Sequence, residues 1–351
     1  MDRPRNFPEA SFVDRPATVA LRAPARLHLG FLDPAGSLGR SFGSVGLVIG
    51  GFETEVEISA SPVDRVTANG PAAHAEIERA AACLRMLRGH TGRRDPLHLR
   101  LEQVLPAHAG FGSGTQLALA IGRAFALWHG LSVPTATLAQ WLGRGLRSGI
   151  GIAGFDHGGL IVDGGPGANG APAAVLSRIP LPEAWRVLIV QDSAQKGLSG
   201  DEERQRIASL PPLPRALAAD ICHQVLMCVL PGAAAADFAP FAAGVTRIQQ
   251  VLGEHFASAQ GGRAFASEAV GCLLGWVLQH RGEHLAAIGQ SSWGPTGFAI
   301  FPSQARAEAA MQAMQAAGVV APSLALRVVS GRNAGATLLD RRPSSPLIST
   351  P

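Results

Sequence analysis

A glycine-rich segment that leads directly into a helix constrains this chain more than any other feature. Residues 106–116 read Pro-Ala-His-Ala-Gly-Phe-Gly-Ser-Gly-Thr-Gln, with glycines alternating at Gly110, Gly112 and Gly114. Because glycine has no Cβ, these positions can take positive φ and turn successive backbone N–H groups toward one anion. Apolar residues at helical spacing follow Thr115, so we predict a helix whose positive N-terminus faces that anion.

This segment differs from the common nucleotide-binding loops. It lacks the Lys-Ser/Thr pair that closes a Walker loop, and it lacks the Rossmann glycine spacing with its downstream acidic residue. Hydroxyl groups at Ser113 and Thr115 add further anion-binding atoms. We therefore predict a phosphate-binding loop of Gly110, Gly112, Ser113, Gly114 and Thr115. A tight strand-to-helix turn without a ligand is the alternative.

The periodicity of the remaining sequence predicts an α+β chain of two domains, because 351 residues is long for one core. In the first half, strands are expected at 18–23, 26–31, 45–49, 52–58 and 97–102, with a helix at 73–87. In the second half, strands are expected at 185–190, 298–301 and 325–329, with amphipathic helices between 201 and 281.

A Gly/Pro/Ala-rich connector near residues 164–182 separates the two halves. We place a phosphate-binding N-terminal domain at 17–175 and a C-terminal domain at 183–340. The polar, Pro-containing ends at 1–16 and 341–351 are expected to be disordered.

Composition argues against several classes of protein. Hydrophobic residues make up 47% of the chain and charged residues 16%, as in folded globular proteins. Apolar runs are interrupted by Gly, Pro or charge before they reach the length of a membrane span, and the first residues do not resemble a signal peptide. The four cysteines include no C-x-x-C pair, which argues against a zinc ribbon or a secreted disulfide framework. We expect a cytoplasmic protein that does not bind membranes.

The charge pattern favours small anionic ligands over nucleic acid. The net charge of +4 is small for this length, and the basic residues are scattered without interleaved aromatic residues. Lys196 is the only lysine among 30 basic residues, so planar and bidentate arginine pairs are the available means of binding anions. We expect a homodimer that binds small molecules and no nucleic acid.

Several polar residues near the glycine-rich loop are candidates for chemistry. Arg26 and His28 lie two residues apart on a predicted strand and share a face, which suits either an anionic substrate or an exposed polar edge. His108 lies inside the loop, where a histidine can move a proton, donate to an oxyanion or simply be solvated.

Two further candidates lie on Gly-rich segments farther along the chain. Asp156 is able to serve as a base, to hold Mg²⁺ or to bond its own turn. Trp293 follows Ser292 on a loop before a predicted strand, and its flat ring suits stacking on an aromatic substrate or closing a domain interface.

Three segments occur in the order of the motifs of the GHMP small-molecule kinase superfamily. Residues 106–116 resemble its second motif, a Pro followed by Gly-Leu-Gly-Ser-Ser, and 24–33 and 290–301 occupy the places of the first and third. More of the chain resembles one branch, the β-ribofuranosylaminobenzene 5′-phosphate synthases. The segments that carry this resemblance are 25–33, 39–44, 108–116, 147–153 with 157–165, 197–200 with Glu202, and 291–295.

The resemblance implies a GHMP-type two-domain fold, with an N-terminal domain like domain 2 of ribosomal protein S5 and a ferredoxin-like C-terminal domain. It also implies a reaction. Enzymes of this branch join 4-aminobenzoate or 4-hydroxybenzoate to phosphoribosyl pyrophosphate and release CO₂ and pyrophosphate, on the way to methanopterin-type one-carbon carriers. They are described as Mg²⁺-dependent and as not consuming ATP.

Site roles are assigned on the basis of that implied reaction. Developing charge on the leaving pyrophosphate would be stabilised by the amides of the glycine-rich loop. The resemblance implies phosphate or carboxylate binding by Arg26, Arg40 and Arg332, contact with the aromatic substrate by Ser292 and Trp293, and catalytic roles for His28, His108 and Asp156. No metal ligand is assigned.

Two other functions stay open on sequence grounds. An ATP-dependent GHMP kinase is disfavoured because Gly114 stands where that motif has a second hydroxyl residue. A non-catalytic ligand-binding member of the superfamily is disfavoured because several chemically capable loops are present together.

Overall fold

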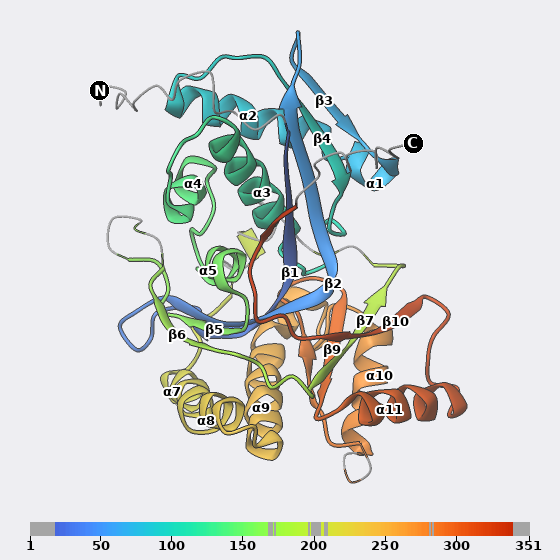
Figure 1. Cartoon of the computed structure of the whole chain (residues 1–351). Helices are drawn as coiled ribbons and strands as arrows, with labels where there is room; N and C mark the ends of the chain where they lie inside the picture. Colours follow the sequence, from blue (N-terminus) through green and yellow to red (C-terminus); the bar gives the residue numbers. More distant parts are fainter. Residues whose placement is uncertain are drawn as a thin grey trace.

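The computed structural model describes residues 18–167, 171, 173–195, 197, 205–206, 210–280, 282 and 284–339. The predictions of disorder at 1–16 and 341–351 lie outside this part of the chain, as do Lys196 and most of the 197–202 segment. Two lobes stand one above the other, and the long strands β1 and β2 pass from the upper lobe to the lower (Figure 1).

The upper lobe is built on a seven-stranded sheet with the order β11-β1-β2-β4-β3, in which β5 pairs with β2 and β6 with β5. Its strands are β1 (Thr18–Asp33), β2 (Phe42–Ala60), β3 (Arg65–Ala68), β4 (Leu97–Gln103), β5 (Leu160–Asp163), β6 (Val175–Ile179) and β11 (Thr337–Leu339). All pairs are antiparallel except β3 with β4.

Each of the two longest strands was expected to be two. Within β1, register shifts at Pro24/Arg26 and His28/Gly30 accommodate the proline as an irregularity, so the strand continues. Within β2, Gly51 takes a φ of 77°, which bends the strand without ending it. The two strands therefore reach both lobes, which places Arg26 and His28 where the lobes meet.

The helices of the upper lobe are α1 (Gly70–His74), α2 (Ile77–Thr91), α3 (Ser113–Trp128), α4 (Thr135–Trp141) and α5 (Ile150–His157). The helix predicted after the glycine-rich loop is confirmed as α3. It is buried along most of its length, with side chains such as Leu117, Ile121 and Phe125 in the core. The helix predicted at 73–87 is divided between α1 and α2.

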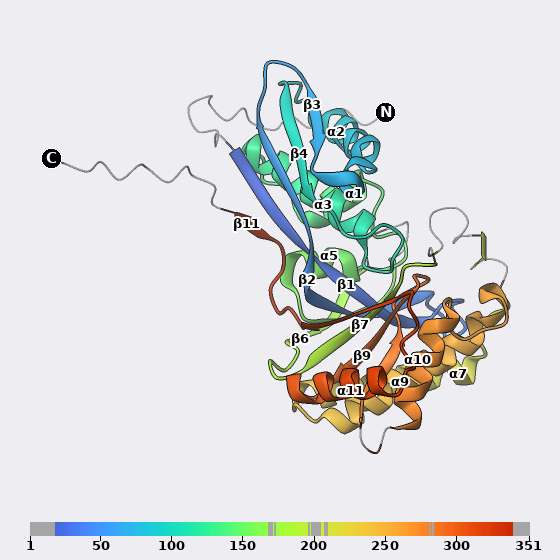
Figure 2. The ribbon, with the colours of Figure 1, turned by 90° about the vertical axis from the view of Figure 1, so that its right-hand side faces the viewer.

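The lower lobe has a ferredoxin-like topology, as expected. Its antiparallel sheet has the order β10-β7-β9-β8, which is 4-1-3-2 when the strands are numbered along the chain. The strands are β7 (Arg186–Asp192), β8 (Ala287–Gln290), β9 (Thr296–Phe301) and β10 (Leu324–Ser330). The helical elements are α7 (Arg215–Gln224), η3 (Val225–Val229), α8 (Leu230–Ala234), α9 (Phe238–Phe256), η4 (Ala257–Gln260), α10 (Glu268–Gln279) and α11 (Gln304–Ala316). Helices α10 and α11 cover the face of this sheet away from the upper lobe, whereas α7, α8 and α9 also contact β1 and β6 of the upper sheet (Figure 2).

Strand pairing does not follow the predicted boundary at 175–183. Strand β6 lies beyond residue 175 and still pairs in the upper sheet, and β11 returns from the end of the chain to pair with β1. One hydrophobic cluster also joins the lobes, because Leu27 and Leu47 pack with Val187 and Phe241. The lobes thus share a core as well as a covalent connection.

One described helical stretch, Arg215–Ala234, is long and apolar enough to cross a membrane by length and composition alone, with a mean hydropathy of 1.5. This differs from the sequence-based expectation that every apolar run is too short to span a membrane. The stretch packs Ile221, Val225 and Val229 into the core that the two lobes share.

Candidate active site

A cleft of about 540 Å³ lies at the N-terminus of α3. Its walls come from β1, the 108–115 loop, the 143–148 segment, Arg79 of α2 and the β8–β9 turn. The predicted site residues that it brings together are Arg26, His28, His108, Gly110, Gly112, Ser113, Gly114, Thr115, Ser292 and Trp293. All three segments that resemble GHMP motifs therefore contribute to one cleft.

The glycine-rich loop uses glycine for two different reasons. Gly110 (φ 86°) and Gly112 (φ 75°) take the left-handed backbone expected for a loop that turns its amides, and Gly112 caps α3 without a side-chain bond. Gly114 lies within the first turn of α3 instead, where a Cβ would lie 3.4 Å from Nη1 of Arg144. The N–H groups of Thr115 and Gln116 both donate to the Gly112 carbonyl at 3.0 Å, so the N–H groups of Ser113 and Gly114 are the ones at the cleft that the helix itself leaves without an acceptor.

Ser291 holds the three motifs against one another. Its Oγ donates to the Gly110 carbonyl at 2.7 Å and accepts from the His28 N–H at 3.0 Å. Arg26 adds a bond from Nη1 to the same Gly110 carbonyl at 2.8 Å. The backbones are so close that a Cβ on Gly294 would lie 2.5 Å from the Gly110 nitrogen.

We expect Ser291→Ala to lower the free energy of unfolding by about 1–3 kcal/mol, because the buried His28 N–H loses its acceptor. Activity should fall as well, since the loop and β1 lose their common anchor. Ser303→Ala is the matched control, because Ser303 only caps α11 by accepting from the Arg306 N–H. The Ser303→Ala replacement should lower the free energy of unfolding, measured in urea, by about 1 kcal/mol and leave kcat/KM unchanged. Equal kinetics for the two variants would contradict this role of Ser291.

His28 is buried, with 4% of its surface exposed, and its ring packs on Phe31 at 4.5 Å between centroids. Burial first, then the charges of Arg26 and Arg147, lower the pKa of His28 to about 3. The imidazole is therefore neutral at physiological pH. Its Nε2 is buried and has no hydrogen-bond partner among the described residues, so this nitrogen is available to bond with a ligand in the cleft.

The low pKa of His28 makes stability depend on pH in a defined window. The pKa of His28 is about 3 in the folded protein, and its ordinary value, which applies to the unfolded chain, is 6.5. Between these two pH values the unfolded state binds more protons, so stability rises with pH and is fully present above pH 6.5. We expect the free energy of unfolding to fall by about 2 kcal/mol more in the wild type than in His28→Gln when the pH is lowered from 8 to 5. Urea unfolding of both proteins at the two pH values measures this difference, and parallel losses would refute it.

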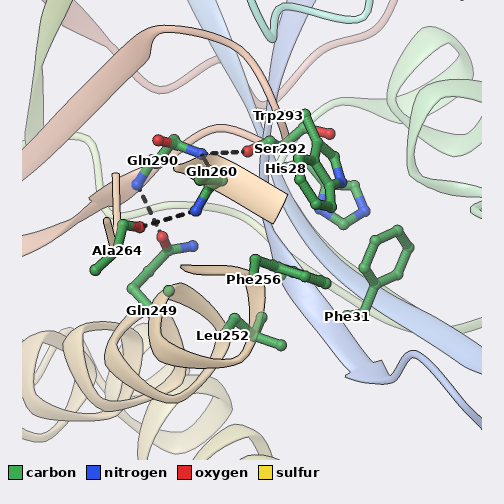
Figure 3. A pocket seen from close by; sticks show the side chains of 12 residues that line it. His28, Phe31, Gln249, Leu252, Phe256, Gln260, Ala264, Gln290, Ser292 and Trp293 are labelled. Atoms are coloured by element: carbon green, nitrogen blue, oxygen red, sulfur yellow. Dashed lines mark hydrogen bonds between the residues drawn. The ribbon is translucent and has the colours of Figure 1, made fainter. Parts of the chain in front are cut away.

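A smaller cavity of about 30 Å³ adjoins the cleft and shares His28, Phe31, Ser292 and Trp293 with it. Trp293 is 3% exposed and packs on Phe256 at 4.8 Å between ring centroids. Figure 3 shows these rings on one side of the cavity and a group of glutamines on the other. The cavity has room for a water or two but not for a benzene ring. Of the aromatic side chains around it, Phe31 and Trp293 also line the larger cleft.

Glutamines fix the loop that carries Trp293. The Nε2 of Gln290 donates to the Ser292 carbonyl at 2.8 Å and to Oε1 of Gln260 at 2.9 Å. Ser292 takes a φ of 54°, and His108 on the facing loop takes a φ of 58°. Two non-glycine residues in left-handed backbone thus line one cleft, a pattern that clusters at functional sites.

Three cationic residues of the cleft were not among the predicted site residues: Arg79, Arg144 and Arg147. Arg144 and Arg147 lie in a Gly-rich run, Gly143-Arg-Gly-Leu-Arg-Ser-Gly149, which was a usable signal for a ligand loop. Arg79 lies on an ordinary amphipathic helix and gave no such signal. The cleft thus has four arginines and two histidines, and no carboxylate among its described lining.

Three predicted site residues lie elsewhere and make structural contacts. Arg332 pairs with Glu53 at 2.8 Å and donates to the Gly335 carbonyl. Asp156 accepts from Oγ1 of Thr135 at 2.6 Å, near the end of α5. Arg40 donates to the carbonyls of 164 and 165, on the turn after β5. The family resemblance and its implied reaction suggested these residues, but their partners come from distant segments that the sequence pattern does not reveal.

The described residues hold no group of three or more His, Cys, Asp or Glu side chains placed to bind a metal ion. The oxygen atoms at the described lining of the cleft belong to the hydroxyls of Ser113, Thr115, Ser148 and Ser292 and to backbone carbonyls. Mg²⁺ prefers carboxylates together with phosphate oxygens and water. This part of the chain therefore does not form a magnesium site by itself.

Comparison with known proteins agrees with this architecture. Residues 77–159 match the GHMP kinases N terminal domain, and residues 229–320 match the GHMP kinases C terminal family. The fold is similar to that of mevalonate diphosphate decarboxylase from Staphylococcus aureus, with a TM-score of 0.68 and 13% identity over 92% of this chain and 98% of that one. The fold is also similar to that of homoserine kinase from Cytophaga hutchinsonii, with a TM-score of 0.62 and 17% identity over 94% of this chain and 100% of that one.

Curated relatives narrow the assignment within this fold. The beta-ribofuranosylphenol 5'-phosphate synthase of Archaeoglobus fulgidus is 35% identical over 82% of this chain and 89% of its own length. The protein of the same name from Methanothermobacter thermautotrophicus is 32% identical over 66% of this chain and 75% of its own. The chain is therefore a member of the beta-ribofuranosylphenol 5'-phosphate synthase family, within the GHMP kinase superfamily.

Proposed function

We propose that this enzyme condenses phosphoribosyl pyrophosphate with 4-hydroxybenzoate and releases CO₂ and pyrophosphate. The observation that carries the proposal is a single cleft with the N-terminus of α3 on one wall and the buried rings of Phe31 and Trp293 on another. The sequence left 4-aminobenzoate and 4-hydroxybenzoate equally open. The relatives are named for a ribofuranosylphenol, and a phenol ring in the product favours 4-hydroxybenzoate.

The leaving pyrophosphate is proposed to lie at the glycine-rich loop. The N–H groups of Ser113 and Gly114, at the start of α3, are preorganised donors, and Gly112 lets the chain approach an anion without a Cβ in the way. Departure of pyrophosphate leaves positive charge at the ribose carbon and adds negative charge to the leaving oxygen. Fixed donors at that oxygen stabilise the transition state without having to reorganise.

The aromatic acid is proposed to lie against Phe31 and Trp293, on the His28 side of the cleft. Arg26 and Arg147 are both close enough to His28 to lower its pKa, so they would bring two positive charges to the substrate carboxylate. A neutral His28 would donate through Nε2 rather than act as a charged acid. The buried rings exclude water from the reacting carbon.

The chemistry then needs positioning more than proton transfer. The ring carbon that bears the carboxylate attacks C1 of the ribose, and the bond from C1 to the pyrophosphate oxygen breaks. Loss of CO₂ returns the electron pair of the carbon–carboxylate bond to the ring and restores aromaticity. No proton has to be removed from the attacked carbon, so attack geometry is the main demand on the protein.

We also propose that Mg²⁺ enters bound to the pyrophosphoryl group, because the described residues of the cleft offer hydroxyls and no carboxylate. The pathway is proposed to be that of methanopterin-type one-carbon carriers, with the enzyme in the cytoplasm as a homodimer.

The test is an incubation of the purified protein with Mg²⁺, phosphoribosyl pyrophosphate and carboxyl-labelled 4-hydroxybenzoate. We expect release of labelled CO₂ that depends on both substrates, and a lower rate with 4-aminobenzoate. Parallel incubations with ATP and small alcohols test the kinase alternative. ADP formation without CO₂ release would favour a kinase, and binding without turnover of any substrate would favour a ligand-binding protein.

A further inference from the structure

We propose that Arg79 and Arg144 form a subsite for the terminal phosphoryl group of the pyrophosphate, and so select a diphosphorylated donor over a monophosphorylated one. This inference rests on the proposed function for the identity of the donor. It concerns two residues that no sequence motif singled out.

The geometry brings the two guanidinium groups to one place. A Cβ built on Gly114 would lie 3.4 Å from Nη1 of Arg144 and 3.9 Å from Nη1 of Arg79. Arg79 comes from the first turn of α2, and Arg144 comes from the glycine-flanked 143–145 segment. Two arginines from separate segments thus converge beside the second residue of α3, on the lining of the cleft.

The charges there are unbalanced among the described residues. Arg79 forms an ion pair with Glu76 at 2.8 Å, whereas Arg144 forms no ion pair within the described part of the chain. The Nε of Arg144 is buried and has no hydrogen-bond partner there. Burial is the first cause, with Arg79 also contributing, of the lowered pKa of Arg144. A bound phosphoryl group would relieve the repulsion and supply the missing acceptor.

The order of groups along the loop indicates which phosphoryl group is bound. Arg26 lies beside Gly112, where a Cβ would be 3.0 Å from its Cζ, and the Arg79–Arg144 pair lies beside Gly114. Two residues of helix advance about 3 Å, comparable to the spacing of adjacent phosphoryl groups. The phosphoryl group attached to the ribose would lie near Gly112, close to the aromatic side, and the terminal one near Gly114.

The test is calorimetric titration of wild type, Arg144→Gln and Arg79→Gln with inorganic pyrophosphate and, separately, with inorganic phosphate. Arg144→Gln is the principal variant, because Arg79→Gln also leaves Glu76 without its ion pair. Arg263→Gln is the matched control, since Arg263 is a surface arginine paired with Glu268. Circular dichroism confirms that each variant is folded.

We expect the preference for pyrophosphate over phosphate to fall roughly 10- to 100-fold in Arg144→Gln, as expected for the loss of a charge-assisted contact. The preference should be unchanged in Arg263→Gln, and affinity for 4-hydroxybenzoate should be unchanged in every variant. An unchanged preference in Arg144→Gln overturns the subsite, as does an equal loss of affinity for pyrophosphate and for phosphate. A fall in the preference in a protein without synthase activity would refute the proposed function and leave the diphosphate subsite standing.

Discussion

Gly110→Ala is expected to lower kcat/KM by at least about 100-fold and stability by about 2–4 kcal/mol. Gly110 has a φ of 86°, and a Cβ there would collide with the backbone carbonyl of Ser291. Because that contact is between two backbones, no side chain can rotate to relieve it. The glycine-rich loop would move away from the β8–β9 turn, and the two walls of the cleft would separate.

Activity assays and urea unfolding measure the two effects together. Gly275→Ala is the matched control, because Gly275 lies within α10 and a Cβ there meets nothing within 4 Å. This control should be slightly more stable than the wild type, by about 0.5–1 kcal/mol, and fully active. Normal turnover by Gly110→Ala would show that close contact of the two loops is not required.

His28→Ala is expected to lower kcat/KM by roughly 100- to 1000-fold, the usual cost of losing one donor to developing charge. His28→Gln should stay within about tenfold of the wild type, because its amide still donates. The reason is the state of the imidazole. With a pKa of about 3 it is neutral, so its role is that of a positioned donor and not of an acid that gains and loses a proton.

The pH profile separates these roles. If His28 acts only as a hydrogen-bond donor, the pH profile of kcat/KM near pH 6.5 should be the same for the wild type and for His28→Gln. A limb near that pH that is present in the wild type and absent in His28→Gln would mean that the imidazole titrates during turnover, and the donor role would be wrong.

Local patterns predicted the elements around the site well and their long-range pairing poorly. The α3 helix and β4 follow directly from helical and alternating spacing. Pro24 and the Gly50-Gly51 pair look like strand ends, yet a bulge and a bend let β1 and β2 continue through them. The return of β11 to β1 depends on contacts across most of the chain, which no local pattern encodes.

The site residues show the same difference between local patterns, which the sequence reveals, and long-range packing, which it does not. The glycines and His108 were found because the loop that carries them has an unusual local composition, and His28 was found because it shares a strand face with Arg26. Arg79 was missed because its role depends on how α2 packs beside α3. Asp156 was chosen as an acid beside a Gly-rich segment, and Arg332 as a cation able to hold an anionic group of the implied substrates, but the folded chain gives both residues partners of their own.

We propose that this cleft joins an aromatic ring to a ribose carbon while the carboxylate leaves. The most direct test is the stoichiometry and structure of the product made from phosphoribosyl pyrophosphate and ¹³C-ring-labelled 4-hydroxybenzoate. We expect equal amounts of CO₂, pyrophosphate and product, with NMR showing a carbon–carbon bond at the ring position that carried the carboxylate. A product that retains the carboxylate, or one linked through oxygen, would contradict it.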